Sequence, residues 1–140
     1  MAEETAPSWA YCPKCDRRLR SPKAWHYCAR VDIATLFEKK DPMVQALYEL
    51  LLREVSTWGD IQASGTKNCI VFTGSHTFLV AKPMKKALDL HFNLPGPHDA
   101  FPVYKCTPYK GYYVHYIRLH DAEDLDGDAL GLMRLAYNQD

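Results

Sequence analysis

Two segments of the chain alternate between apolar and polar residues, and this pattern restricts the folds open to it. In residues 88–94 (LDLHFNL) every second residue is leucine or phenylalanine, with Asp89, His91 and Asn93 between them. Residues 111–120 (GYYVHYIRLH) alternate in the same way. Successive side chains of a strand point to opposite faces, so each segment predicts a strand with one buried and one solvated face. Strands of this kind are typical of antiparallel sheets.

Helical patterns lie before and after these strands. Asp41 is suited to cap a helix with Pro42 in its first turn, and apolar residues follow at helical spacing until Gly59. Near the C-terminus, Asp126 or Asp128 is suited to cap a second helix with an apolar stripe. We therefore expect one amphipathic helix before the strands and one after them.

Two shorter strand patterns complete the body of the chain. CIVF (69–72) and TFLVA (77–81) are rich in β-branched and aromatic residues, and a turn separates them. We expect residues 31–40 to form a linker with a short helical turn and residues 94–111 to form a proline-rich loop. Because the strands are grouped between helices, residues 31–140 predict an α+β domain, an antiparallel sheet with two helices packed on one face.

Four residues near the N-terminus have the spacing of a metal site. Cys12 and Cys15 form a C-x2-C pair, and His26 and Cys28 are separated by one residue. Together they make a Cys3His set, a common composition of structural zinc sites. We predict that residues 1–30 form a zinc-ribbon knuckle around one structural Zn2+. Four protein ligands leave no open coordination position, which disfavours a catalytic zinc.

Three other interpretations of these cysteines stay open: a disulfide, free buried thiols and a redox pair. The N-terminus lacks the basic-then-apolar order of a signal peptide, and no run approaches the roughly 20 apolar residues of a membrane span. We therefore expect a cytoplasmic protein without membrane association, in which thiols stay reduced and disulfides are rare. A redox pair needs a helix directly after the C-x2-C, and the polar segment that follows Cys15 predicts none.

The charge of the chain is balanced overall but uneven along its length. Seventeen basic and seventeen acidic residues give a formal net charge of zero, which disfavours a wholly basic nucleic-acid coat. The basic N-terminal segment includes Arg17, Arg18 and Arg20, whereas residues 121–140 are mainly acidic. The three arginines are therefore candidates for contacts with nucleic-acid phosphates, with an acidic protein, or with the acidic end of the same chain or of a second copy.

Several motifs together resemble a known family. They are CPKC…HYC, the helix DPMVQALYELLLREV, Thr66-Lys67 before a strand, the strand LDLHFNL, and HYIRLHDAEDLD near the end. From Tyr11 onward the chain resembles the bacterial family called domain of unknown function 5655, whose members often begin with a short zinc ribbon. Gly65 departs from the proline that this family often has before Thr-Lys. The resemblance implies the fold and no activity; because relatives occur in DNA-directed proteins, it favours nucleic acid by analogy.

Candidate ligand-binding residues lie in the strand region. Thr66 and Lys67 precede a strand, where a lysine is suited to contact a phosphate or carboxylate. His91, Tyr113 and His115 would line the open side of the sheet if the solvated faces of their strands adjoin. Tyrosines alternate with lysines and an arginine between residues 104 and 118, a pattern suited to stacking bases and holding phosphates.

The sequence contains no nucleophile elbow, no glycine-rich phosphate loop and no HExxH motif. We therefore expect a zinc-containing binding module that contacts nucleic acid, rather than an enzyme. Two alternatives stay open. One is a protein-interaction or self-association module, and the other is a small-molecule binder or enzyme that uses the histidines and tyrosines of the sheet.

Overall fold

The computed structural model describes residues 10–11, 18–19 and 32–139. In the N-terminal part, β1 (Ala10–Tyr11) pairs antiparallel with β2 (Arg18–Leu19) to form a separate two-stranded sheet. The predicted zinc ligands Cys12, Cys15, His26 and Cys28 lie outside the described residues, as do Arg17 and Arg20. The zinc knuckle therefore stays a prediction.

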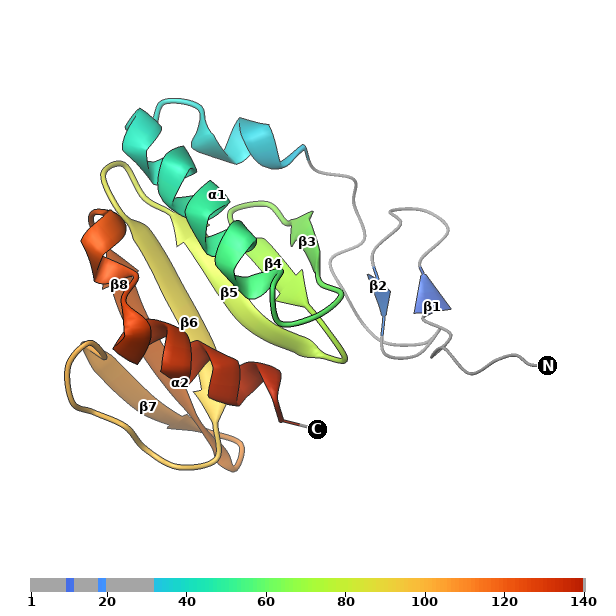
Figure 1. Cartoon of the computed structure of the whole chain (residues 1–140), viewed down its shortest axis with the longest axis vertical. Helices are drawn as coiled ribbons and strands as arrows, with labels where there is room; N and C mark the ends of the chain where they lie inside the picture. Colours follow the sequence, from blue (N-terminus) through green and yellow to red (C-terminus); the bar gives the residue numbers. More distant parts are fainter. Residues whose placement is uncertain (1–9, 12–17, 20–31, 140) are drawn as a thin grey trace.

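The body of the chain is a six-stranded antiparallel sheet with two α-helices (Figure 1). This confirms the predicted α+β class. The strands are β3 (Gln62–Gly65), β4 (Ile70–Thr73), β5 (Thr77–Pro83), β6 (Leu88–Leu94), β7 (Lys105–Tyr109) and β8 (Tyr112–Leu119). They lie in the order β3-β4-β5-β6-β8-β7, so the short strands β3 and β7 form the two edges.

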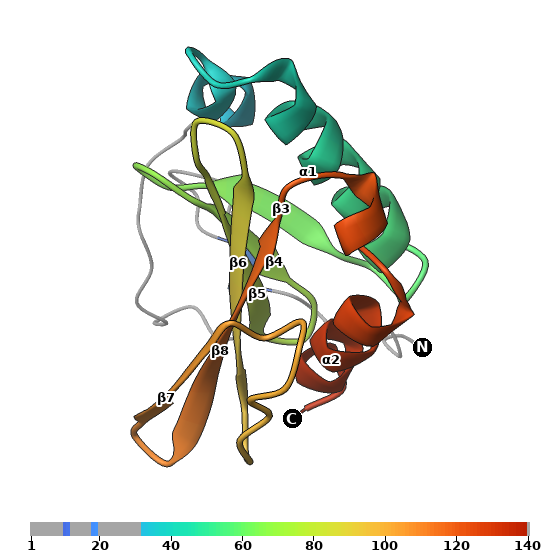
Figure 2. The ribbon, with the colours of Figure 1, turned by 90° about the vertical axis from the view of Figure 1, so that its left-hand side faces the viewer.

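Both helices lie on the same face of this sheet (Figure 2). Helix α1 (Pro42–Val55) begins after Asp41, whose carboxylate accepts a hydrogen bond from the Met43 N–H, as its sequence pattern predicts. Helix α2 (Gly127–Tyr137) begins after Asp126, whose carboxylate accepts one from the Ala129 N–H. Among the described residues, neither helix is long and apolar enough to cross a membrane.

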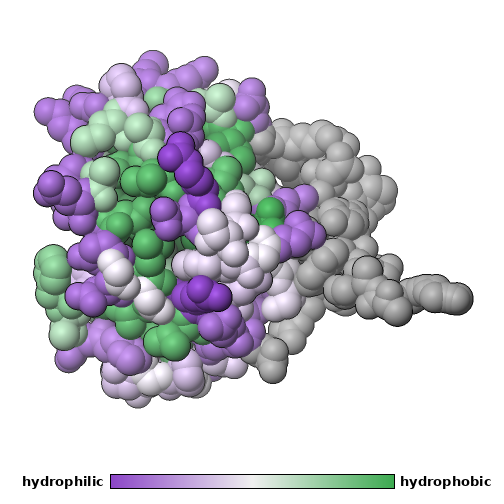
Figure 3. All heavy atoms as spheres, in the orientation of Figure 1, coloured by the Kyte–Doolittle hydropathy of each residue, from purple (hydrophilic) through white to green (hydrophobic). Residues whose placement is uncertain are grey.

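The hydrophobic core lies between the helices and the sheet. Every second residue of β6 is buried against the helices, as the alternation of LDLHFNL predicts. The buried side of α1 includes Val44, Leu47 and Leu51. Figure 3 shows the helix-covered face, where hydrophobic side chains gather between the two helices and hydrophilic ones surround them.

Two connecting segments have more structure than predicted. The short helical turn predicted within the linker is the 3-10 helix η2 (Ile33–Phe37), but its Phe37 is buried, and the ring of Phe37 lies 5.4 Å from that of Tyr48. The segment therefore belongs to the core. The expected proline-rich loop contains the edge strand β7, which accommodates Pro108 because an edge strand has one side without a partner strand.

Candidate functional site

The face of the sheet opposite the helices is the candidate site. One row of side chains crosses this open face: Val80 of β5 pairs with His91 of β6, His91 with Tyr116 of β8, and Tyr116 with Lys105 of β7. Residues directly opposite each other in an antiparallel pair point to the same face. The alternation that buries Leu90 and Phe92 under the helices therefore places His91 on the open face.

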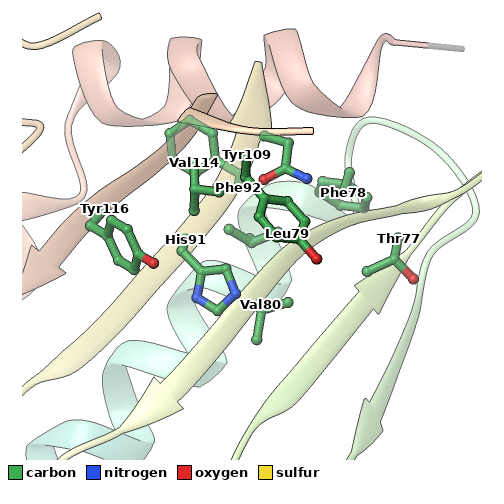
Figure 4. A pocket seen from close by; sticks show the side chains of 10 residues that line it. Thr77, Phe78, Leu79, Val80, His91, Phe92, Tyr109, Val114 and Tyr116 are labelled. Carbon is green, nitrogen blue, oxygen red and sulfur yellow. The ribbon is translucent and has the colours of Figure 1, made fainter. Parts of the chain in front are cut away.

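A hollow of about 350 Å³ lies on this face (Figure 4). Its polar and aromatic lining residues are Thr77, Phe78, His91, Phe92, Asn93, Tyr109 and Tyr116, and its aliphatic ones are Leu79, Val80 and Val114. The rings of His91 and Tyr116 have centroids 5.6 Å apart. The hollow thus has aromatic and aliphatic walls with a few polar groups, as ligand sites commonly do.

Three cations lie over tyrosine rings around this face. The Lys105 ammonium is 5.1 Å from the centroid of Tyr116, and the Lys110 ammonium is 5.2 Å from that of Tyr109. The Arg118 guanidinium carbon is 4.7 Å from the centroid of Tyr104. Such contacts hold long cationic side chains beside aromatic surface while the charge stays accessible to an anion.

Asp89 is the acidic residue of strand β6, and neighbouring side chains bind its carboxylate. Its carboxylate accepts hydrogen bonds from the Tyr104 hydroxyl (2.6 Å) and from Arg118 Nε (3.3 Å), and Lys82 lies opposite it on β5. Partial burial, together with the hydrogen bond to Asp89, raises the pKa of Tyr104, so its hydroxyl stays protonated. Lys105 and Lys110, which lie over the rings of Tyr116 and Tyr109, supply the other positive charges near the hollow.

His91 is neutral at neutral pH. Its half-buried ring is desolvated, which lowers its pKa, and the nearby Asp89 carboxylate offsets only part of this effect. A neutral imidazole carries one hydrogen-bond donor and one acceptor. His91 therefore presents neutral polar atoms, rather than a charge, to whatever enters the hollow.

The structure separates His115 from His91. His115 lies on the helix-covered face with 0% exposure, and its ring stacks on Phe92. Its Nδ1 contacts the Tyr113 carbonyl oxygen (2.8 Å), and its Nε2 contacts the His98 N–H (2.9 Å). A carbonyl only accepts and an N–H only donates, so the ring is the neutral tautomer with the proton on Nδ1.

The partners of His115 indicate a structural role. Burial lowers its pKa, and both ring nitrogens are already satisfied by the backbone. Its bond with His98 attaches the loop between β6 and β7 to the sheet. Tyr113 lies two residues before the buried His115 on β8, so its side chain is on the same, helix-covered face. The expected cluster of His91, Tyr113 and His115 is therefore not formed, because strand alternation divides it between the two faces.

Thr66 and Lys67 lie in the turn between β3 and β4, at the opposite end of the sheet from the hollow. The Thr66 N–H donates to the Cys69 carbonyl (2.8 Å), and the Thr66 hydroxyl accepts from the Cys69 N–H (3.1 Å). These bonds close the turn and leave Lys67 exposed. Burial raises the pKa of the Cys69 thiol, which favours its protonated form.

A larger hollow of about 520 Å³ lies at another edge of the domain. Its lining includes Phe101, Tyr104, Arg118 and Asp124. The Asp124 carboxylate at this hollow accepts hydrogen bonds from the His120 and Asp121 N–H groups. The arginine of this hollow, Arg118, forms a salt bridge with a second carboxylate, that of Asp89. An anionic ligand is therefore better suited to the first hollow.

The sequence pattern placed Tyr109 and Lys105 in one candidate binding stretch, but it did not associate Val80 with them. The alternation of tyrosines with cations was the available signal, but the face of each residue depends on the pairing of β7, which was expected to be a loop. In the part of the chain that the structure describes, no group of three or more histidine, cysteine, aspartate or glutamate side chains is placed to hold a metal ion.

Comparison with protein families gives a match over most of the chain. Residues 33–140, most of the chain, match the family described as "Domain of unknown function (DUF5655)". No curated protein and no solved structure matches the chain. The matched region contains both helices and all six strands of the main sheet, so the chain belongs to the DUF5655 family.

Proposed function

We propose that the protein is a non-catalytic binding module that contacts nucleic acid through the open face of its sheet. The observation that carries this proposal is the set of three cation–tyrosine pairs on that face, two of which lie beside an aromatic hollow. Proteins that bind single strands combine cations, which hold phosphates, with aromatic rings, on which bases stack. A solvated antiparallel sheet is a common platform for both.

The zero net charge does not oppose this proposal, because the acidic residues near the C-terminus have local structural roles. The carboxylate of Asp121 accepts from the Glu123 N–H (2.9 Å), and that of Asp126 accepts from the Ala129 N–H (2.9 Å). These residues cap the 3-10 helix η3 (Ala122–Asp124) and α2. Helix α2 lies on the face opposite the proposed binding surface (Figure 2), so the Asp126 carboxylate that caps it lies away from Lys105 and Lys110.

The N-terminal segment has a supporting role in this proposal. Cys12, Cys15, His26 and Cys28 would hold one structural Zn2+, and the arginines nearby would add phosphate contacts. A Cys3His site requires reduced thiols, so the chain would act in the cytoplasm.

Fluorescence anisotropy with short labelled strands tests the proposal. We expect single-stranded DNA or RNA to bind the full-length protein with micromolar or tighter affinity, and the affinity to fall steeply between roughly 50 and 200 mM salt. The double variant Lys105→Gln/Lys110→Gln should bind more weakly. Its charge-matched control, Arg53→Gln/Arg134→Gln on the two helices, should bind like the wild type. Absence of binding at low salt would overturn the proposal.

A further inference from the structure

We propose that the hollow on the open face receives one unpaired base of a single strand, with the adjoining phosphates at its rim. This inference rests on the proposed function and names the ligand of that same surface. It would make the domain selective for single strands over duplexes, because a stacked and paired base cannot enter a concave site.

The size of the hollow favours a single nucleotide. Its volume of about 350 Å³ is at the low end of the roughly 300–1,000 Å³ found for small-molecule sites. It lies near the end of the sheet where β7 reaches Tyr109, so the edge strand forms one wall (Figure 4). A duplex would meet only the outer rim of such a site.

The walls supply a stacking surface. Tyr109 is 56% exposed at the edge strand, and its ring lines the hollow. Lys110 lies over one face of the ring, 5.2 Å from its centroid, and a base would stack on the other face. Val80 and Val114 add aliphatic surface to the lining of the hollow. Stacking of a base on an exposed tyrosine tolerates any sequence, because every base has a π face.

Neutral polar groups lie inside the hollow, and charged groups lie at its rim. The hollow itself contains neutral groups, which are the His91 imidazole, the Asn93 amide and the Thr77 hydroxyl. The cations Lys105 and Lys110 belong to the neighbouring edge strand and its turn. Neutral donors and acceptors suit the uncharged edge of a base, whereas the ammonium groups suit phosphates. An inorganic anion would find its partners only at the rim.

The first test uses single nucleotides and the full chain. Nucleoside 5′-monophosphates are titrated while the backbone amide resonances are followed by NMR, with ribose 5-phosphate and inorganic phosphate as probes that lack a base. We expect the nucleotides to shift the amides of Val80, His91 and Tyr116, and the two base-free probes to leave them unchanged. Equal shifts with ribose 5-phosphate would overturn the inference.

The second test uses strands and one side chain. Tyr109→Ala should weaken single-strand binding roughly five- to 150-fold, the loss expected for one stacked base. Tyr109→Phe keeps the ring and should retain binding. Phe101→Ala removes an exposed aromatic (85% exposed) outside the hollow and should have no effect. An abasic strand should bind the wild type as weakly as a normal strand binds Tyr109→Ala.

The results separate this inference from the proposed function. If single strands bind with salt dependence but Tyr109→Ala and the abasic strand bind normally, the base site is overturned and nucleic-acid binding stands. If duplexes bind as tightly as single strands, the base site is likewise overturned. If neither strands nor nucleotides bind, both proposals fail.

Discussion

At the scale of single residues, the alternation of side chains along a strand gives His91 and His115 different surroundings. His91 and His115 lie on neighbouring strands, yet one faces solvent beside a hollow and the other is fully buried. Burial lowers the pKa of each. Only His91 is placed to meet a ligand, because the ring nitrogens of His115 are both bonded to backbone groups. The sequence shows both histidines but does not show that His98 would supply a partner for one of them.

The buried His115 predicts a dependence of stability on pH. Its pKa is lowered in the folded chain and returns to about 6.5 on unfolding. Between these values the unfolded chain binds a proton that the folded chain does not, so the free energy of unfolding falls as the pH drops below about 6.5. The fall is at most about 1.4 kcal/mol per pH unit for this group.

Urea denaturation of wild type and His115→Gln between about pH 7.5 and 5 measures this contribution. Glutamine keeps a donor and an acceptor but does not titrate, so the variant should lose less stability on acidification than the wild type. His120→Gln, at an exposed position, serves as the control and should keep the wild-type profile. Identical pH profiles for His115→Gln and the wild type would contradict the prediction.

At the scale of elements, the segments with one buried face were predictable and the edge strand β7 was not. The strand β6 and the helix α1 alternate between buried and exposed positions, which produces a sequence pattern. The edge strand β7 is exposed or half-buried throughout and contains Pro108, so no such pattern arises. The tyrosines and cations were predictable as a group. Their common face was not predictable, because Tyr109 and Lys105 belong to β7.

Gly59 serves a tertiary contact rather than the end of α1. The helix ends at Val55, four residues before the glycine that was expected to stop it. A Cβ atom at Gly59 would collide with the Tyr137 hydroxyl, which donates a hydrogen bond to the Trp58 carbonyl (3.1 Å). Gly59 therefore serves the close approach of α2 to this turn.

A double-mutant cycle tests this contact. Gly59→Ala should lower the free energy of unfolding by about 1–3 kcal/mol, because the added methyl group must displace Tyr137. In the Tyr137→Phe background the same substitution should cost less, since the colliding oxygen is gone. Thermal or urea unfolding of the four proteins measures the coupling. Equal costs in both backgrounds would show that Gly59 has another role.

At the scale of the whole molecule, one face of the sheet forms the core and the other is the proposed binding surface. The helix-covered face contains the core and the capping carboxylates, whereas the open face contains the cation–tyrosine pairs. The sequence predicted the layers of this arrangement. It could not predict the hollow, which depends on residues from β5, β6, β7 and β8 meeting across the sheet.

The α+β body has its own core, which predicts that it folds without the zinc knuckle. The full-length protein should contain one zinc per chain by elemental analysis, and Cys15→Ser should lose it. The unfolding transition of the body should be unchanged, because metal binding supplies folding energy only to the segment that holds the metal. Lys14→Gln, which leaves the four ligands intact, should keep the zinc. Retention of zinc by Cys15→Ser would contradict the ligand assignment.

The central claim is that the open face binds nucleic acid through its phosphates and bases. The most direct test is the slope of log Kd against log salt concentration for a short single strand, measured for the wild type and for Lys105→Gln/Lys110→Gln. Loss of two phosphate contacts should reduce the slope by about 1.4, since each contact to a single strand contributes about 0.7. An unchanged slope, or a wild type that binds no strand at low salt, would contradict the account.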